Sequence, residues 1–536
     1  MMPNSSLNAQ WIQLGTHIDS WGNAFPVGLP LDDLLVHTGI SGTTGSGKSA
    51  LLRNIALQAF VHGTNVVVLE PHGDLILHPD EGILATLPSN QLDRVTIVDP
   101  TSAMPSQINL VTANKLAGHS VAVQTVMNSL RMVDEANWNA AIRMREILEN
   151  ALHILLAVDG NKACLARLQR FLYDETFRQR ILKKAEDDVG DSREAFERLN
   201  KALRKERDGG ESVWEVPRRR VANLLRDDRL RRMLALPVLD PQTALNLPAL
   251  LNQKQGQLLL IPLQANVLGD NAKRVLGSLM MQLLTQTLMQ RRRDERHATL
   301  IIIDEFADLA GSMVGELTKT LLAESRKFGA AVVLATQALH QLPRDVQDEW
   351  KSNANNKIVL RTSSPDDARI AVNNLAHSEL NEYDLLHIEK YCAYAKVTTG
   401  GEPQEAFYCH TQPPLTAQDV RQMQKILGQQ CQTQAEESAE ITLPPRDTTM
   451  ERALQALYRM QPERAIQSLA QTESSLLRRL LQTQCIMSQH AAHELQQAPQ
   501  SIPEPVERAL QISRYRMGMP YWFYEAIYRR LRFTAK

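Results

Sequence analysis

Eight consecutive residues near the amino terminus have the types and the spacing of a phosphate-binding loop. Residues 42–49 read Gly-Thr-Thr-Gly-Ser-Gly-Lys-Ser, which fits the pattern GxxxxGK[ST] at every fixed position. The glycines of such a loop let successive backbone N–H groups point at phosphate oxygens, and the positive end of the following helix adds to the attraction. We therefore expect a nucleotide to be bound by Gly42, Thr43, Thr44, Gly45, Ser46, Gly47, Lys48 and Ser49.

Two side chains of this loop have chemistry of their own. Lys48 should reach the β- and γ-phosphate oxygens as a point charge, and the hydroxyl of Ser49 should supply one oxygen ligand to Mg²⁺. The flanking sequence favours this interpretation, because the apolar stretch 34–40 predicts a strand before the loop and apolar residues recur at helical spacing over 51–60. A glycine-rich turn that fits the pattern by chance would lack both neighbours.

A second motif carries two carboxylates. Residues 299–303 form an apolar run typical of a buried strand, and Asp304 and Glu305 follow it. Such a strand delivers Asp304 to the edge of a sheet, where its carboxylate can hold Mg²⁺ through water, while Glu305 can act as general base for an attacking water. The alternative is a buried strand that ends at two surface acids. The phosphate loop earlier in the chain favours the catalytic interpretation.

Two further residues fit the same chemistry. The run 330–337 predicts a strand that lies between the two nucleotide motifs and ends at Gln337, whose amide can contact the γ-phosphate. Arg326 stands where a helix is expected to end. An arginine there can stabilise the developing phosphate charge in a neighbouring subunit, an effect on the order of 10³-fold in rate. The alternative for Arg326 is a cation that only stabilises the helix terminus through the helix dipole.

Strands that alternate with helices must position these residues. Besides the strand before the loop, the sequence predicts strands at 65–70, 94–99, 256–263, 299–305, 330–337 and 357–361, with helical patterns between them. This alternation is typical of an α/β fold with a parallel doubly wound sheet. Residues 8–35 predict a small β-rich lead-in, and 391–399 with 406–409 predict the strands that close the domain.

The chain of 536 residues is longer than one hydrophobic core usually supports. Over 113–236, apolar residues recur every three or four positions without a strand pattern, which predicts an all-α insertion. The predicted organisation is a nucleotide-binding domain in two parts (1–112 and 237–412), an all-α insertion (113–236), a polar linker (413–449) and a C-terminal helical extension (450–536).

Composition limits the classes of protein. The formal net charge of −1 argues against a chain that coats nucleic acid by bulk charge, so a role on DNA would need local basic patches. The arginine clusters at 218–220 and 229–232 are candidates, although solvated helix faces are the simpler explanation.

Cysteine usage and hydropathy bear on location. The five cysteines show no CxxC spacing, which favours free thiols in a reducing cytosol over disulfides or a zinc site. No apolar run has the length of a transmembrane segment, and residues 1–10 lack the apolar core of a signal peptide. We expect a cytoplasmic protein that reaches the inner membrane, if at all, peripherally through a partner.

Four features in this order resemble the HerA–FtsK superfamily of RecA-like motor ATPases. They are the loop 42–49, the sequence Glu70-Pro-His-Gly-Asp74, the sequence Ile303-Asp-Glu-Phe306, and residues 324–329 followed by Ala335-Thr-Gln337. The branch that looks most similar is the TraG/TraD-like coupling ATPases of type IV secretion and conjugation, in which an all-α domain interrupts the nucleotide domain. Glu70 departs from the aspartate usual in the family, and the membrane-spanning segment of typical coupling proteins is missing.

This resemblance over roughly residues 10–410 implies a RecA-like P-loop NTPase fold, ATP and Mg²⁺ as cofactors, and a homo-oligomer, a hexameric ring with nucleotide at the subunit interfaces. The implied function is an ATP-hydrolysing DNA translocase or coupling ATPase that pumps or recruits DNA, with a secretion channel, a relaxase or a nuclease as partner. Two alternatives remain: an ATP-gated recruitment scaffold for protein substrates, and a HerA-like motor in DNA processing or phage defence.

Overall fold

A computed structural model describes residues 11–426, except 20, 103–104, 112–117, 188–190, 208–212, 237–243 and 310–311. The predicted C-terminal helical extension and most of the predicted linker lie outside the described residues. Within the described part, the helices are too short or too polar to cross a bilayer. The cysteines of this part, Cys164, Cys392 and Cys409, are buried free thiols, as the spacing predicts.

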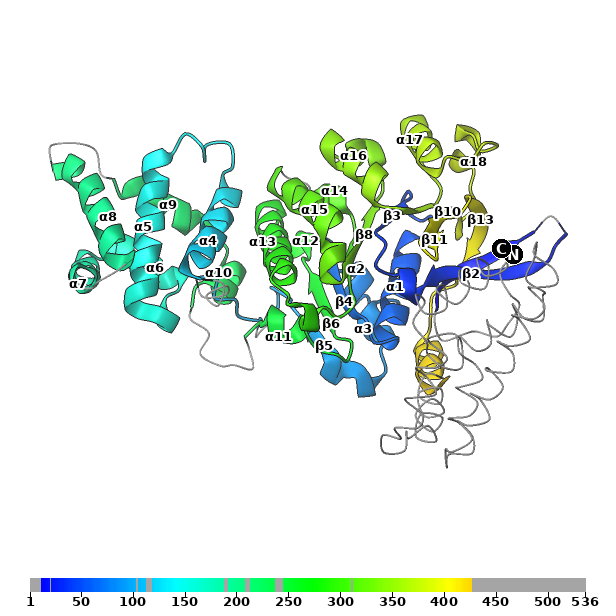
Figure 1. The fold of residues 1–536 in the computed structure, drawn as a ribbon, viewed down its shortest axis with the longest axis horizontal. Helices are drawn as coiled ribbons and strands as arrows, with labels where there is room; N and C mark the ends of the chain where they lie inside the picture. The colour runs from blue at the N-terminus through cyan, green and yellow to red at the C-terminus, as the bar shows by residue number, and fades with distance from the viewer. Residues whose placement is uncertain are drawn as a thin grey trace, which may run out of the picture. The chain divides into compact units, whose positions relative to one another are not determined.

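One large sheet organises the described residues (Figure 1). Its strands, in spatial order, are β2 (Ala24–Pro30), β1 (Trp11–Ile18), β13 (Phe407–Thr411), β10 (Cys392–Lys396), β9 (Asn356–Val359), β3 (Thr38–Ser41), β8 (Ala330–Thr336), β7 (Thr299–Ile303), β4 (Asn65–Glu70), β6 (Leu258–Pro262) and β5 (Val95–Ile97). The strands from β9 to β5 pair in parallel, as predicted. A separate ribbon joins β11 (Thr398–Thr399) and β12 (Glu402–Pro403).

The other four strands extend the predicted parallel sheet through antiparallel pairs. β10 pairs antiparallel with β9, β13 with β10, β1 with β13, and β2 with β1. Within the β-rich lead-in predicted for residues 8–35, β1 and β2 form a hairpin that extends the main sheet through β13. The parallel edge strand β9 has N–H and C=O groups that need a partner, and β10 supplies it by antiparallel pairing.

Helices cover both faces of the sheet, since successive residues of a buried strand point in opposite directions. Val66 and Val68 of β4 join the core under α1 (Lys48–Val61), α2 (Asp74–Leu77) and α3 (Ile83–Thr86). Val67 and Leu69 join the opposite core. That core is covered by α11 (Leu247–Leu251), α12 (Ala265–Leu268), α13 (Asp270–Met289), α14 (Phe306–Leu309), α15 (Ser312–Glu324), α16 (Arg344–Asn353), α17 (Pro365–Leu375) and α18 (Glu382–Leu386).

The chain between β5 and α11 forms helices wherever it is described, apart from a single bridge between Gln107 and Ala244. These helices are α4 (His119–Val133), α5 (Ile142–Asp159), α6 (Leu165–Tyr173), α7 (Glu175–Glu186), α8 (Asp191–Arg207), α9 (Glu215–Leu224) and α10 (Asp228–Leu234) (Figure 1). Apolar residues of α5 such as Leu148 and Leu152 are fully buried among them. The hydroxyl of Thr125 on α4 donates to the Gln286 side chain on α13, at 3.2 Å.

The strand before the phosphate loop is shorter than the apolar run predicts. Only residues 38–41 are extended, because residues 31–33 form a 3₁₀ turn and the Val36 N–H donates to the Asp33 carbonyl. Leu34 and Val36 are nevertheless buried. The apolar run therefore indicates that these residues are buried, and a turn can be buried as well as a strand.

The spatial order places the loop strand β3 beside β8, and β8 beside β7, so β8 lies between the two nucleotide motifs as predicted. The strands are parallel, and therefore their carboxyl ends meet at one edge of the sheet. Ligands of open α/β sheets gather at that edge.

Gly39 in the middle of β3 leads to a prediction about stability. A Cβ atom at Gly39 would lie 2.4 Å from the Trp350 ring, which is buried on α16. Gly39→Ala should therefore lower the free energy of unfolding by roughly 1–3 kcal/mol through overpacking. Gly315→Ala is the matched control, because there a Cβ meets only ordinary contact at 3.5 Å and alanine favours the helix. Equal urea midpoints for the two variants would contradict this packing.

Candidate nucleotide site

The phosphate loop joins β3 to α1 in a conformation that needs its glycines. Gly45 and Gly47 have φ angles of +77° and +109°, in the left-handed region that other residues rarely adopt. The Gly42 N–H donates to the Thr336 carbonyl at the end of β8, at 3.2 Å. A Cβ atom at Gly42 would meet the Leu360 side chain at 2.8 Å. The loop is thus fixed to the neighbouring strands, and its shape depends on small residues.

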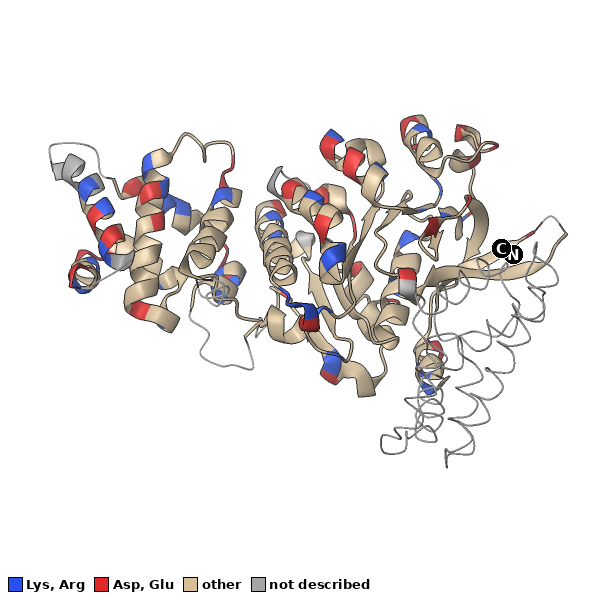
Figure 2. Cartoon of the chain, in the orientation of Figure 1, with Lys and Arg blue, Asp and Glu red and all other residues tan. Residues whose placement is uncertain are grey.

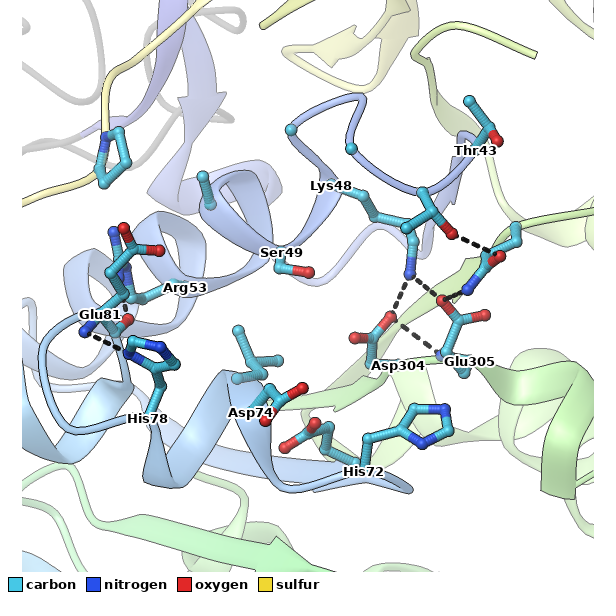
Figure 3. Close-up of a pocket in the computed structure, with 18 of the residues that line it drawn as sticks. Thr43, Lys48, Ser49, Arg53, His72, Asp74, His78, Glu81, Asp304 and Glu305 are labelled. Carbon is cyan, nitrogen blue, oxygen red and sulfur yellow. Dashed lines mark hydrogen bonds and ion pairs between the residues drawn. The ribbon is translucent and has the colours of Figure 1, made fainter. Parts of the chain in front are cut away.

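A buried ion cluster lies under the loop. The Lys48 Nζ is 2.5 Å from Asp304 Oδ1 and 2.6 Å from Glu305 Oε1 (Figure 3). The three side chains are only 6, 8 and 11% exposed. Burial opposes the charged form of Lys48, but the two carboxylates outweigh it and raise the pKa of Lys48 above its ordinary value. The sequence motifs separated by more than 250 positions therefore meet in one charge network.

Glu305 reaches this cluster through an unusual backbone turn. Its φ angle is +44°, a left-handed conformation that costs a non-glycine residue about 1–2 kcal/mol. The Glu305 N–H donates to Asp304 Oδ1 at 2.9 Å, and the Asp304 N–H donates to the Leu69 carbonyl at 3.0 Å. These two bonds hold the turn, which brings the Glu305 carboxylate within 2.6 Å of Lys48. Strain of this kind is typical of functional positions.

Gln337 connects the loop to the candidate base. Its Nε2 donates to Glu305 Oε1 at 2.8 Å, and its Oε1 accepts from the Thr44 hydroxyl at 2.9 Å. The structure thus brings together Lys48, Thr44, Asp304, Glu305 and Gln337. The amide orients the carboxylate, and the same amide contacts the loop that the phosphates would occupy.

The structure places Arg326 at the opposite edge of the sheet. It belongs to a 3₁₀ turn, Ser325–Phe328, that precedes β8, whereas Gln337 follows β8. The intervening strand of seven residues separates them by on the order of 20 Å. Arg326 lies instead near His37. Burial lowers the pKa of His37 to about 4, and the charge of Arg326 acts in the same direction. Arg326 therefore does not reach the nucleotide site of its own subunit.

A cavity of about 400 Å³ surrounds the ion cluster. Its lining adds residues that sequence reasoning did not assign to the site: Ala50, Arg53, Glu70, His72, Asp74, Leu75, His78, Glu81, Lys390, Tyr391 and Pro414. Figure 3 shows Asp304 and Glu305 on one side of Ser49 and Arg53, His78 and Glu81 on the other. The cavity therefore has a phosphate end at the acids and a second end that can hold a nucleoside.

Tyr391 forms part of the wall beside the loop. Its φ angle is +63°, its N–H donates to the Ser46 carbonyl at 3.0 Å, and its carbonyl accepts from the Thr411 N–H at 2.7 Å. A Cβ atom at Gly47 would lie 2.7 Å from the Tyr391 ring. The antiparallel strands β10 and β13 thus hold an aromatic ring against the phosphate loop. No local sequence pattern predicts this contact, because it depends on how β10 and β13 extend the sheet.

Glu70 ends β4 inside the same cavity. It is only 2% exposed, its Oε1 accepts from the Gly73 N–H at 2.8 Å, and its Oε2 has no hydrogen-bond partner among the described residues. Burial raises the pKa of Glu70 to about 7, and the charge of Asp304 adds to the effect. The resemblance drew attention to Glu70 only as a departure from aspartate.

The donor set fits Mg²⁺. Oxygen ligands from a hydroxyl, carboxylates and phosphates are the ones that this hard cation prefers, and Ser49, Asp304 and Glu70 all line the cavity. His72 is 3.5 Å from Asp308. Within the described part of the chain, no three His, Cys, Asp or Glu side chains form a further metal-binding cluster.

Several arginines of the two clusters in the insertion are bonded to other parts of the chain or to their own helix. Arg220 pairs with Asp134 at 3.2 Å, and Arg231 pairs with Asp228 at 3.0 Å. Figure 2 shows acidic and basic residues mixed along these helices. Arg220 is buried and therefore does not belong to a solvated helix face, the simpler interpretation from sequence, whereas Arg219 and Arg232 are exposed, as that interpretation predicts.

The fold and the site together define a P-loop ATPase of the RecA-like kind. Residues 12–284, just over half of the chain, match the family model of the central domain of helicase HerA. Residues 249–444 match the model of the DNA-binding domain of type IV secretion-system coupling proteins. The chain therefore belongs to the HerA family of ATPases, and residues 249–444 are similar to the DNA-binding domain of coupling proteins.

Solved structures share the fold at low identity. VirB4 of Thermoanaerobacter pseudethanolicus is 14% identical with a TM-score of 0.50, and the match covers 77% of this chain and 98% of that one. The bacterial conjugative coupling protein TrwB, in an unbound form, is 16% identical with a TM-score of 0.49, covering 75% and 91%. TrwB with ADP and Mg²⁺ is 17% identical with a TM-score of 0.47, covering 73% and 90%. A comparison with curated protein sequences finds no match.

The raised pKa of Glu70 predicts a pH effect on stability. The folded protein holds this proton up to about pH 7, whereas the ordinary value is 4.5. The contribution of Glu70 to the free energy of unfolding is therefore largest below pH 4.5 and falls as pH rises through about 7. Glu70→Gln cannot ionise, so it should lose less stability over this range than the wild type, by up to about 3 kcal/mol. Urea denaturation at about pH 5 and about pH 8 measures the difference. If the free energy of unfolding changes equally with pH in Glu70→Gln and in the wild type, the pKa of Glu70 is not raised.

Proposed function

We propose that this HerA-family ATPase works as a homo-oligomeric ring, a hexamer, that uses ATP hydrolysis to pump or recruit DNA for a type IV secretion or conjugation system. The observation that carries the proposal is the contact of Lys48, Asp304, Glu305 and Gln337 at the phosphate loop. The match to a coupling-protein DNA-binding domain supports DNA as the substrate. A partner in the secretion channel would bring the ring to the inner membrane.

Phosphate binding changes the partners of Lys48. The lysine that pairs with two carboxylates is also the residue of the loop that reaches the β- and γ-phosphates. When Lys48 turns to the phosphates, the Glu305 carboxylate loses its cation and can accept a proton from the attacking water. Gln337 keeps Glu305 in place through its 2.8 Å hydrogen bond. Since the other end of the Gln337 amide contacts Thr44 of the loop, this residue can respond to the γ-phosphate.

Mg²⁺ would be held by the Ser49 hydroxyl directly and by Asp304 through water. When bound, the cation neutralises charge on the phosphate oxygens. Asp304 is well placed for this role, because its backbone N–H is fixed to the Leu69 carbonyl and its side chain is buried.

Arg326 acts, in this proposal, on the nucleotide of the adjacent subunit. Its distance from its own site, on the order of 20 Å, supports a role across the interface. His37, which lies near Arg326, is fixed beside the start of β8, because its Nδ1 accepts a hydrogen bond from the Val332 N–H at 3.0 Å. A guanidinium at this place can stabilise the charge of the transferring phosphoryl group.

DNA-stimulated ATP turnover tests the proposed function. Duplex DNA should raise the turnover of the wild type several-fold, because DNA assembles or engages the ring. Glu305→Gln should keep ATP binding but lower turnover about 10²–10⁴-fold with and without DNA, since an amide cannot accept the proton. Steady-state phosphate release and equilibrium ATP binding measure both quantities. Turnover indifferent to DNA would favour a recruitment scaffold for proteins, and unchanged turnover in Glu305→Gln would exclude Glu305 as the base.

Mixing two inactive variants tests the role of Arg326. Arg326→Ala should lower turnover strongly while leaving ATP affinity nearly intact, and Lys48→Ala should lose phosphate binding. In mixed rings, an intact Arg326 from one subunit faces an intact Lys48 site on the next, so part of the activity should return. The Arg326→Ala variant without any Lys48→Ala protein is the control. Mixtures that co-assemble but stay inactive would show that Arg326 serves its own subunit or only the helix end.

A further inference from the structure

Glu70 has a carboxylate oxygen that the described residues leave unsatisfied. Its Oε1 accepts from the Gly73 N–H, but its Oε2 is buried without a hydrogen-bond partner among them. A buried acceptor with no partner costs about 1–3 kcal/mol, and more when it is charged. Burial raises the pKa of Glu70 to about 7, because a buried position disfavours the charged carboxylate. The backbone N–H groups of Leu75, Gly73 and Ile76 act in the opposite direction and lower this pKa. Oε2 itself remains open to a donor from outside the described residues.

The position of Glu70 limits what that donor can be. Glu70 lines the cavity with Ser49 and Asp304, and β4 neighbours β7 in register, with Leu69 opposite Ile303. An ionised Glu70 does not pair with a phosphate group, because both carry negative charge and offer only acceptors. The nucleoside end of the cavity, at Arg53 and Glu81, lies on the other side of Ser49 (Figure 3). The remaining donor is water at the phosphate end.

The water that this site would hold in place is one bound to a cation. Mg²⁺ takes about six oxygen ligands and usually keeps several waters, each with two hydrogens to donate. Asp304 Oδ1 already accepts from the Glu305 N–H and from Lys48. With nucleotide bound, Asp304 keeps the Glu305 N–H on Oδ1, and its other acceptor sites serve only part of a hydration shell of several waters. A second carboxylate on the neighbouring strand supplies the missing acceptor.

We propose that Glu70 is a second outer acceptor for the metal of this site, whose free carboxylate oxygen takes a hydrogen bond from a Mg²⁺-bound water. The inference rests on the proposed function only in that the site binds a magnesium nucleotide. Glu70 is then a positioning residue: it orients the hydration shell and does not touch the reacting phosphate. A bound dication also offsets the charge that burial disfavours.

Magnesium-dependent ADP binding tests the proposal. ADP affinity is measured by calorimetry on the full chain, first without divalent cations and then over a Mg²⁺ titration. Glu70→Gln should bind ADP like the wild type without Mg²⁺ but should need about 10–100-fold more Mg²⁺ to reach the tight complex. Glu316→Gln is the matched control, because Glu316 is exposed on α15 and does not line the cavity, and it should leave both values unchanged.

Glu70→Asp provides a second variant with the charge retained and the reach shortened. It should need more Mg²⁺ than the wild type and less than Glu70→Gln, and its fold is checked by its Mg²⁺-free ADP affinity. If Glu70→Gln and the wild type show the same Mg²⁺ dependence, Glu70 is not an acceptor for the metal's water. If Glu70→Gln loses ADP affinity without Mg²⁺ and Glu70→Asp matches the wild type throughout, the carboxylate only supports the turn, and the proposal is overturned. A wild type that binds no ADP would overturn the proposed function instead.

Discussion

The buried contact between Lys48 and the carboxylates of Asp304 and Glu305 constrains the whole sheet. Two acids with little exposure would be strongly destabilising without a cation between them, because an unpaired buried charge costs several kcal/mol. The lysine follows β3 and the acids follow β7, so the carboxyl ends of these two strands must be level with each other. The strand β8 lies between them, and its parallel register with each neighbour fixes their relative positions along the strand direction. A slip of one residue would turn the inward side chains of a strand to the opposite face.

Gln337 and Arg326 show how the same strand serves two ends of the subunit. The amide lies beside Glu305 at the carboxyl end of β8, and the guanidinium lies near His37 at its amino end. β8 is fully buried and its residues belong alternately to both cores, so a displacement of the strand would disturb both.

Much of this arrangement follows from the sequence. The phosphate loop and the apolar strand before Asp304 are local patterns, and they predicted the strands β4, β7 and β8 and the order of β3, β8 and β7. The rest depends on contacts between distant residues. The apolar run 34–40 could not distinguish a buried turn from a strand, and the hairpin of residues 11–30 had no pattern that revealed its pairing with β13. The left-handed turn at Glu305 and the buried oxygen of Glu70 arise only when β4 and β7 are side by side.

The bridge between Gln107 and Ala244 has a consequence for the helical insertion. The chain leaves the sheet after β5 and returns to it at β6, and these two strands pair with each other. Both ends of the insertion are thus attached at one edge of the sheet, where β5 is the outermost strand. A segment attached in this way can be lengthened, shortened or exchanged in evolution while the hydrogen-bond ladder of the sheet stays closed. The nucleotide site can remain constant while the helical insertion diversifies.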